Sequence, residues 1–135
     1  MTKVSILNTE VLFTKEKINL EKAEREFETD LNFVTIASAQ PNDIFLSKEY
    51  ADYQFKETSH IHINFLMHDP IQFELPAMSL KELIWNISKI YVEVFQKFRK
   101  EARVCCSGHE FLYLNKINIH SNNIVSLTVS QKIKS

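Results

Sequence analysis

His60 and His62 are the pair of side chains in this chain most suited to chemistry. They begin a run of alternating apolar and polar residues, 60–67, which predicts a strand with both imidazoles on the same face. Two imidazoles on one strand face are a geometry that metal ions use. The default interpretation is a pair of exposed or hydrogen-bonded histidines, because the sequence contains no Cys-x-x-Cys pair and no His-Glu-x-x-His motif.

The chain holds further residues that could ligate a metal ion, and one candidate nucleophile. The additional ligand types are His68, Cys105, Cys106, His109 and His120. An imidazole at His109 could lower the pKa of a nearby thiol and make Cys106 a nucleophile. Buried cysteines that act as small apolar side chains are more common, and no thiol-enzyme signature surrounds this pair. An enzyme using His60 and His62, or Cys106 and His109, is therefore the alternative hypothesis, and no cofactor is predicted.

The sole tryptophan, Trp85, lies away from the apolar stripe of a predicted helix. At about 100° per residue it falls about 140° from the middle of that stripe, on a side that also carries cations. Tryptophan and arginine are enriched in the hot spots of protein interfaces. The other interpretation is that an N-terminal helix or residues 40–58 cover Trp85 and make it part of the core. The predicted partner-binding residues are Trp85, Lys89, Arg99, Lys100, Arg103, Tyr50 and Tyr53.

The basic end of this helix also suggests a nucleic-acid partner. A base could stack on Trp85 while the phosphates meet the cations. Residues 58–135 carry nine bases and six acids, but the whole chain has a formal net charge of −1 and attracts no polyanion. Basic residues in the last turns of a helix also complement its dipole, which is the simpler explanation. Nucleic acid is therefore the less favoured partner.

Composition excludes several classes of protein. Gly108 is the only glycine, so the chain has no G-x-G-x-x-G fingerprint, no P-loop and no G-x-S-x-G elbow. A chain of 135 residues is expected to be a single domain that buries a core without disulfides or metal. No apolar run approaches a membrane span, and we expect no signal peptide. A bridge between Cys105 and Cys106 would be strained, so reduced thiols and a cytoplasmic location are expected.

A long helix is the clearest of the elements that must position these residues. Residues 79–103 carry apolar side chains at steps of three and four, which predicts an amphipathic helix. Ser79 is placed as its N-cap, and Glu82 completes a capping box. This helix therefore marks the position of the core.

Two hairpins flank the helix in the sequence. Residues 60–75 alternate around a loop at 68–70, and a three-residue loop would place Ile63 opposite Leu75. Residues 110–130 alternate around Ser-Asn-Asn, and a three-residue loop would place Ile119 opposite Val125. Both hairpins would present one apolar face to the helix.

The first half of the chain is less regular. Apolar residues at 4, 6, 11 and 13 predict an extended N-terminal segment. Leu20, Ala23, Phe27 and Leu31 have the spacing of a short helix of about three turns. Residues 33–39 predict a further strand, and 40–58 a loop with a short strand near Phe55.

Together these patterns predict an α+β fold. An antiparallel sheet of four or more strands, built from hairpins at about 60–75 and 110–130, carries the 79–103 helix on one face, with a short N-terminal helix. The favoured function is a small, soluble, non-enzymatic protein-binding module of the immunity, inhibitor or adaptor type. Its partner is expected to be another protein, rather than nucleic acid or a membrane, and an edge at 124–130 could pair with a second copy in a homodimer.

Overall fold

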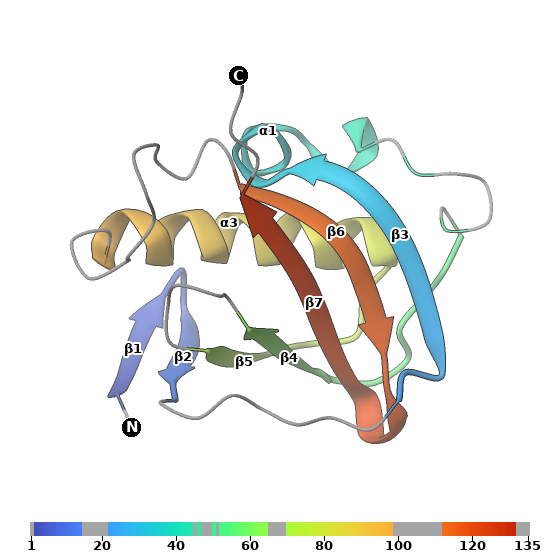
Figure 1. Ribbon diagram of the computed structural model, residues 1–135, viewed down its shortest axis with the longest axis horizontal. Helices are drawn as coiled ribbons and strands as arrows, with labels where there is room; N and C mark the ends of the chain where they lie inside the picture. Colours follow the sequence, from blue (N-terminus) through green and yellow to red (C-terminus); the bar gives the residue numbers. More distant parts are fainter. Residues whose placement is uncertain are drawn as a thin grey trace.

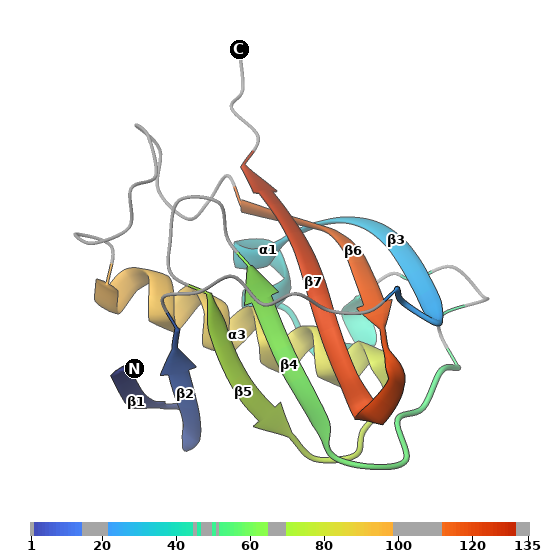
Figure 2. The same ribbon diagram turned by 60° about the horizontal axis from the view of Figure 1, so that its bottom comes forward.

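The protein is represented by a computed structural model, which describes residues 2–14, 22–44, 46, 50, 52–64, 70–98 and 112–131. The predicted α+β class is confirmed, because the described residues form a mixed seven-stranded sheet and two α-helices. Figures 1 and 2 show the longer helix lying across one face of the sheet. Within the described ranges, no helix has the length and apolar character needed to cross a lipid bilayer.

The seven strands are arranged in space differently from their order in the chain. Across the sheet the order is β1-β2-β5-β4-β7-β6-β3. Every neighbouring pair is antiparallel except β4 and β7, which are parallel. This central pair corrects the prediction of an antiparallel sheet, because hairpin patterns do not specify which strands meet between hairpins. The strands are β1 (Thr2–Ile6), β2 (Thr9–Phe13), β3 (Arg25–Asn32), β4 (Ser59–Asn64), β5 (Ile71–Leu75), β6 (Leu112–Ile119) and β7 (Ile124–Gln131).

The helix α3 (Leu80–Phe98) covers the core face of the sheet. Ser79 caps it, since the serine Oγ accepts a hydrogen bond from the Glu82 N–H at 3.2 Å. Ile87, in the middle of the apolar stripe, is completely buried. Removing such a side chain from water contributes roughly 1.5–3 kcal/mol. The predicted helix is thus confirmed over residues 80–98, whereas 99–103 lie outside the described residues.

The register of the β6–β7 pair agrees with the sequence prediction, and that of the β4–β5 pair does not. Ile119 faces Val125, as predicted. Ile63, however, faces Ile71 rather than Leu75, a shift of four residues. An even shift leaves the same side chains on the buried face, so the hydrophobic pattern does not distinguish the two registers.

The helix predicted from Leu20 to Leu31 is wrong over the part of that segment that the structure describes. Residues 25–32 form β3, the edge strand that pairs with β6. Phe27 is buried between the exposed residues Glu26 and Glu28, so the segment also has the period of a strand. Pairing with β6 favours the strand over the helix, because tertiary contacts often outweigh local propensity in short segments.

The strand predicted at 33–39 is instead a short helix, α1 (Phe33–Ser38). Asn32 caps this helix, because its side-chain oxygen accepts a hydrogen bond from the Thr35 N–H at 3.0 Å. Phe33 stacks on Tyr91 of α3 with the ring centroids 4.7 Å apart. Burial raises the pKa of the Tyr91 hydroxyl. The predicted short N-terminal helix is therefore wrong for the described residues: their first helix follows β1, β2 and β3 in the chain and packs beside α3.

The β1–β2 hairpin contains an unusual turn. Ile6 pairs with Thr9, and the two residues between them, Leu7 and Asn8, have φ values of 50° and 63°. A two-residue turn with both φ values positive suits asparagine and glycine, whereas leucine in this region is strained by roughly 1–2 kcal/mol. Among the described residues, Leu7 is also the one exposed large hydrophobic side chain, with 51% of its surface accessible.

We expect the substitution Leu7→Asn to raise the free energy of unfolding by about 1 kcal/mol, because asparagine adopts positive φ with less strain. Urea unfolding of the two proteins measures the difference. Ser5→Asn, at a strand position of the same hairpin, is the control and should not stabilise the protein. A loss of stability in Leu7→Asn would contradict this description of the turn.

Candidate functional site

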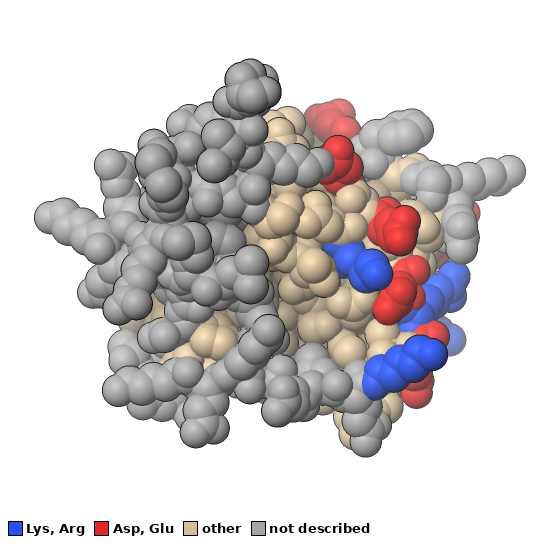
Figure 3. All heavy atoms as spheres, viewed as in Figure 1, with Lys and Arg blue, Asp and Glu red and all other residues tan. Residues whose placement is uncertain are grey.

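The face of the sheet opposite α3 is polar. On β6 and β7, Asn118 donates to Ser126 at 3.4 Å, and Asn115 donates to Ser130 at 2.6 Å. Figure 3 shows charged side chains gathered toward β3, beside a neutral surface. The described part of this outer face is therefore solvated along most of its width, as is common for one face of an antiparallel sheet.

This outer face is interrupted where β2 separates from β5. The two strands pair at Leu12 with Gln72 and at Phe13 with Ile71. Pairing stops there, although β2 extends back to Thr9 and β5 extends on to Leu75. The same register would pair Val11 with Phe73 and then bring two carboxylates, Glu10 and Glu74, opposite each other. Like charges at directly opposed positions disfavour pairing.

The separation leaves backbone hydrogen-bonding groups without a ladder partner. The two-residue turn makes Ile6 and Thr9 a hydrogen-bonded pair, so alternation turns the N–H and C=O of Glu10 toward β5. The Thr14 N–H donates to the Pro70 carbonyl at 2.9 Å, and the same alternation turns the backbone groups of Glu74 toward β2. Two strand edges therefore face each other across the gap.

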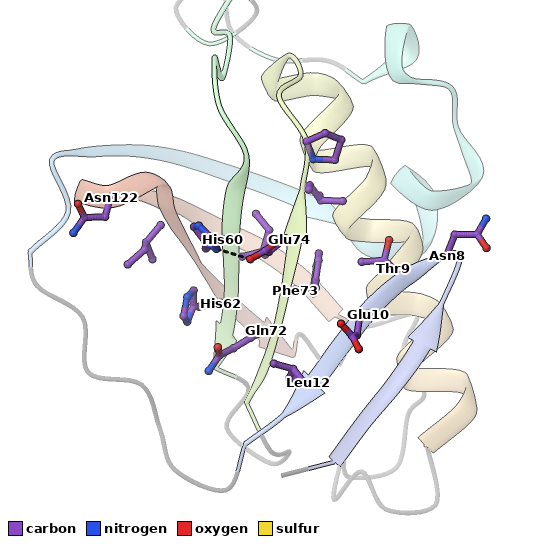
Figure 4. Close-up of a pocket in the computed structure, with 14 residues that line it drawn as sticks. Asn8, Thr9, Glu10, Leu12, His60, His62, Gln72, Phe73, Glu74 and Asn122 are labelled. Carbon is purple, nitrogen blue, oxygen red and sulfur yellow. Dashed lines mark ion pairs between the residues drawn. The ribbon is translucent and has the colours of Figure 1, made fainter.

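A groove of about 700 Å³ includes this separation and extends over β5 and β4 to the start of β7; we call it the β2–β5 groove. Figure 4 shows β2 diverging from β5, with Glu10 on one side and His60, Gln72 and Glu74 on the other. The groove is broad and open at the surface of the sheet. Its lining residues are Asn8, Thr9, Glu10, Leu12, His60, Ile61, His62, Gln72, Phe73, Glu74, Leu75, Pro76, Asn122 and Ile124.

Each carboxylate of the groove contacts a basic side chain. Glu10 pairs through Oε1 with Lys3 of β1. Oε1 of Glu74 lies 3.1 Å from Nδ1 of His60 on β4, a contact that is an ion pair when the imidazole is protonated. The Glu10 and Glu74 side chains are 62% and 67% exposed, so both pairs are solvent-screened and weak. Neither pair prevents the carboxylates from meeting a third group.

His62 is the half-buried histidine of the groove. Its Nδ1 is inaccessible to solvent and has no hydrogen-bond partner among the described residues. Burial, then the neighbouring His60 and His120, lower the pKa of His62 from its ordinary value. His120 lies close to β7, where its Nε2 is 2.7 Å from the Ser126 Oγ. His62 therefore favours its neutral form in the folded protein.

The histidines predicted as metal ligands do share a face of β4, but they gather no third ligand in the described part of the chain. Within residues 2–14, 22–44, 46, 50, 52–64, 70–98 and 112–131, no group of three or more His, Cys, Asp or Glu side chains is placed to hold a metal ion. The other candidates, His68, Cys105, Cys106 and His109, lie outside these residues. The metal-dependent or thiol enzyme therefore stays a prediction.

Trp85 is half-buried and anchored within the protein. Its indole N–H donates a hydrogen bond to the Ala39 carbonyl at 2.7 Å, just after α1. The ammonium group of Lys89 lies 4.0 Å from the indole centroid. The residue that follows α1 thus contacts the ring, whereas the sequence interpretation named an N-terminal helix or residues 40–58 as its cover; the indole is half-buried and stays partly accessible. Of the predicted cationic neighbours, Arg99, Lys100 and Arg103 lie outside the described residues.

Tyr50 and Tyr53 pack on the edge strand β3. Their ring centroids lie 4.6 Å and 5.2 Å from that of Phe27, in edge-on geometry. The Arg25 guanidinium lies 5.0 Å from the Tyr53 centroid. The tyrosines and Trp85 therefore make separate sets of contacts, and these contacts do not draw the predicted partner-binding residues into one cluster.

The β2–β5 groove is a concave site that sequence reasoning missed. Glu10, Gln72 and Glu74 look like ordinary outward residues of strands, and only the pairing of β2 with β5 brings them together. The one local signal is Leu7, an apolar residue in a two-residue turn between alternating segments. Comparison of the chain with protein-family models, curated proteins and solved structures finds no match.

The indole hydrogen bond generates a stability prediction. We expect Trp85→Phe to lower the free energy of unfolding by about 1–2 kcal/mol, because it leaves the Ala39 carbonyl without its donor. Urea unfolding monitored by circular dichroism measures the change. Val92→Ala, a small truncation of a half-buried residue on the same helix, is the comparison for lost packing. An unchanged stability in Trp85→Phe would show that the bond contributes nothing.

The lowered pKa of His62 generates a pH prediction. The unfolded chain binds a proton at this residue more readily than the folded chain, so stability should fall as the pH drops through 6.5, the ordinary histidine value. We expect a smaller fall in His62→Gln. Urea unfolding on either side of this pH tests the difference, and an NMR titration gives the pKa directly. A His62 pKa at or above 6.5 would contradict the assigned environment.

Proposed function

We propose that the protein is a small cytoplasmic, non-enzymatic protein-binding module, of the immunity, inhibitor or adaptor type, and that its partner docks at the β2–β5 groove. The observation that carries this proposal is the separation of β2 from β5. It presents the N–H and C=O groups of Glu10 and Glu74 toward an open groove. Exposed strand edges bind extended polypeptide through main-chain hydrogen bonds.

The turn beside the groove supports the same proposal. Leu7 is exposed at the tip of the β1–β2 hairpin, next to Asn8 and Thr9, which line the groove. Single exposed leucines are ordinary on protein surfaces. A leucine that is also held at positive φ is not, because asparagine or glycine would relieve the strain. Strain of this kind commonly persists where a side chain is needed for binding. Leu7 is thus assigned as an apolar anchor for the partner.

The shape and charge of the groove favour a polypeptide over the other ligand classes. Pockets for small molecules usually bury most of the ligand, whereas the carboxylates here are more than half exposed. A nucleic-acid phosphate would meet Glu10 and Glu74, which repel it. Trp85 and Lys89 stay a predicted second contact surface. The hydrogen bond to the Ala39 carbonyl orients the indole before a partner binds, which reduces the conformational entropy lost on binding.

Affinity capture with paired variants tests the proposed function. The wild-type chain, tagged at its C-terminus, is used to capture proteins from the native host, followed by quantitative mass spectrometry. We expect a partner whose recovery falls about tenfold or more in Leu7→Asn, since burying a leucine anchor contributes roughly 1.5–3 kcal/mol. Leu7→Asn should at the same time be more stable than the wild type, so misfolding cannot explain the loss.

A second variant separates the groove from the rest of the outer face. Gln72→Trp adds bulk inside the groove and should also abolish capture of this partner. Thr128→Trp places the same bulk on β7, where Thr128 is exposed and outside the groove lining, and should leave capture intact. Equal recovery with all four proteins would refute docking at the groove.

A further inference from the structure

We infer that the segment received by the β2–β5 groove presents a lysine or arginine side chain, which lies between Glu10 and Glu74. This inference deepens the proposed function and rests on it. Among the fourteen lining residues, these two are the only carboxylates, and none is a lysine or an arginine. The lining therefore favours a cation over an anion, and a cationic side chain complements it.

The two carboxylates lie on facing strands, and we assign one cation to both. They occupy positions of β2 and β5 that continue the register of Leu12 with Gln72, on the same outer face. Figure 4 shows them on opposite sides of the groove, on the diverging strands. A guanidinium group has five N–H donors and can bridge two carboxylates. Two carboxylates at opposed positions disfavour strand pairing. The same arrangement becomes favourable once a cation lies between them.

The existing ion pairs leave room for this contact. Lys3 is on β1, and so lies on the side of β2 away from β5. His60 is on β4, on the side of β5 away from β2. Each pair uses the Oε1 atom of its glutamate. The Oε2 atom of each carboxylate is therefore the acceptor assigned to the incoming cation.

The backbone of the same segment has its own partners. The N–H and C=O groups of Glu10 and Glu74 face the groove from its two sides. An extended segment that bonds to either edge alternates its side chains across the sheet. One of its side chains then lies on the outer face, level with the carboxylates. Main-chain bonds would supply affinity without sequence preference, and the carboxylates would supply the preference for a cation.

The test uses two peptides that differ only in charge. The probe is an acetylated and amidated pentapeptide of alternating valine and threonine with arginine at its centre. Its control has citrulline, which is nearly isosteric and uncharged, at the centre. Each is titrated into the ¹⁵N-labelled full chain to about 10 mM, enough to detect weak binding. We expect the arginine peptide to shift the amide signals of Glu10 and Glu74 and to bind about fivefold or more tightly than the control.

Variants locate the effect. Glu74→Gln keeps the size of the side chain and should remove most of the preference for arginine over citrulline. Glu93→Gln, a matched change at an exposed glutamate of α3, should leave the preference unchanged. Equal binding of the two peptides, shifts that map away from the groove, or no shifts at all would overturn the inference. So would tighter binding of a glutamate-centred peptide.

The outcomes distinguish this inference from the proposed function. If capture of a partner depends on Leu7 and Gln72 but the peptides show no preference for arginine, the protein-binding function stands and the cationic occupant is wrong. If the arginine preference is present but no captured protein responds to Leu7→Asn or Gln72→Trp, the groove selects cations and the proposed function fails.

Discussion

The structure depends on the burial of α3 against one face of the sheet. The apolar stripe of the helix, with Leu83, Ile84 and Ile87 fully inaccessible to solvent, meets the inward side chains of the strands. A sheet of this width needs such a cover, because strands alone cannot remove their apolar face from water. The burial also fixes which side of every strand is inward. The opposite face is then available for polar residues and for contacts outside the molecule.

The same burial explains how β2 can separate from β5 and still remain part of the fold. Val11 and Phe13 of β2 belong to the hydrophobic core, so the strand stays attached through its inward side chains. Its outward residues and its backbone edge are less constrained. Unpaired backbone groups are tolerated there because water reaches them in an open groove. A break in the hydrogen-bond ladder therefore coexists with an intact core.

Two departures from local rules meet in the β1–β2 hairpin: a leucine at positive φ and a ladder that ends early. Each opposes folding, and neither contributes to the core. In most proteins the local preferences of the sequence agree with the structure that it adopts. Departures from these preferences usually persist where they serve binding. The carboxylates fit the same view. Like charges on Glu10 and Glu74 would oppose closure of the gap, and a cation between them would convert this repulsion into attraction.

Much of the fold could be predicted from local patterns. The spacing of apolar residues identifies α3 over residues 80–98, and alternation identifies β6 and β7 with the correct register of Ile119 and Val125. These predictions succeed because burial of one face imposes a period of 3.6 or 2 on neighbouring residues. The acidic segment 25–32 has both periods, so its helical prediction failed when pairing with β6 decided for a strand.

What the sequence by itself determined is thus which side chains face the core along the clearest elements, and the type of those elements. Tertiary structure alone decided the parallel contact of β4 with β7, the four-residue shift of β5, and the groove between β2 and β5. The physical reason is that hydrophobic periodicity specifies only which face of a strand is buried. It does not specify which strands are neighbours, it does not distinguish registers that differ by an even number of residues, and it does not show where the hydrogen-bond ladder ends.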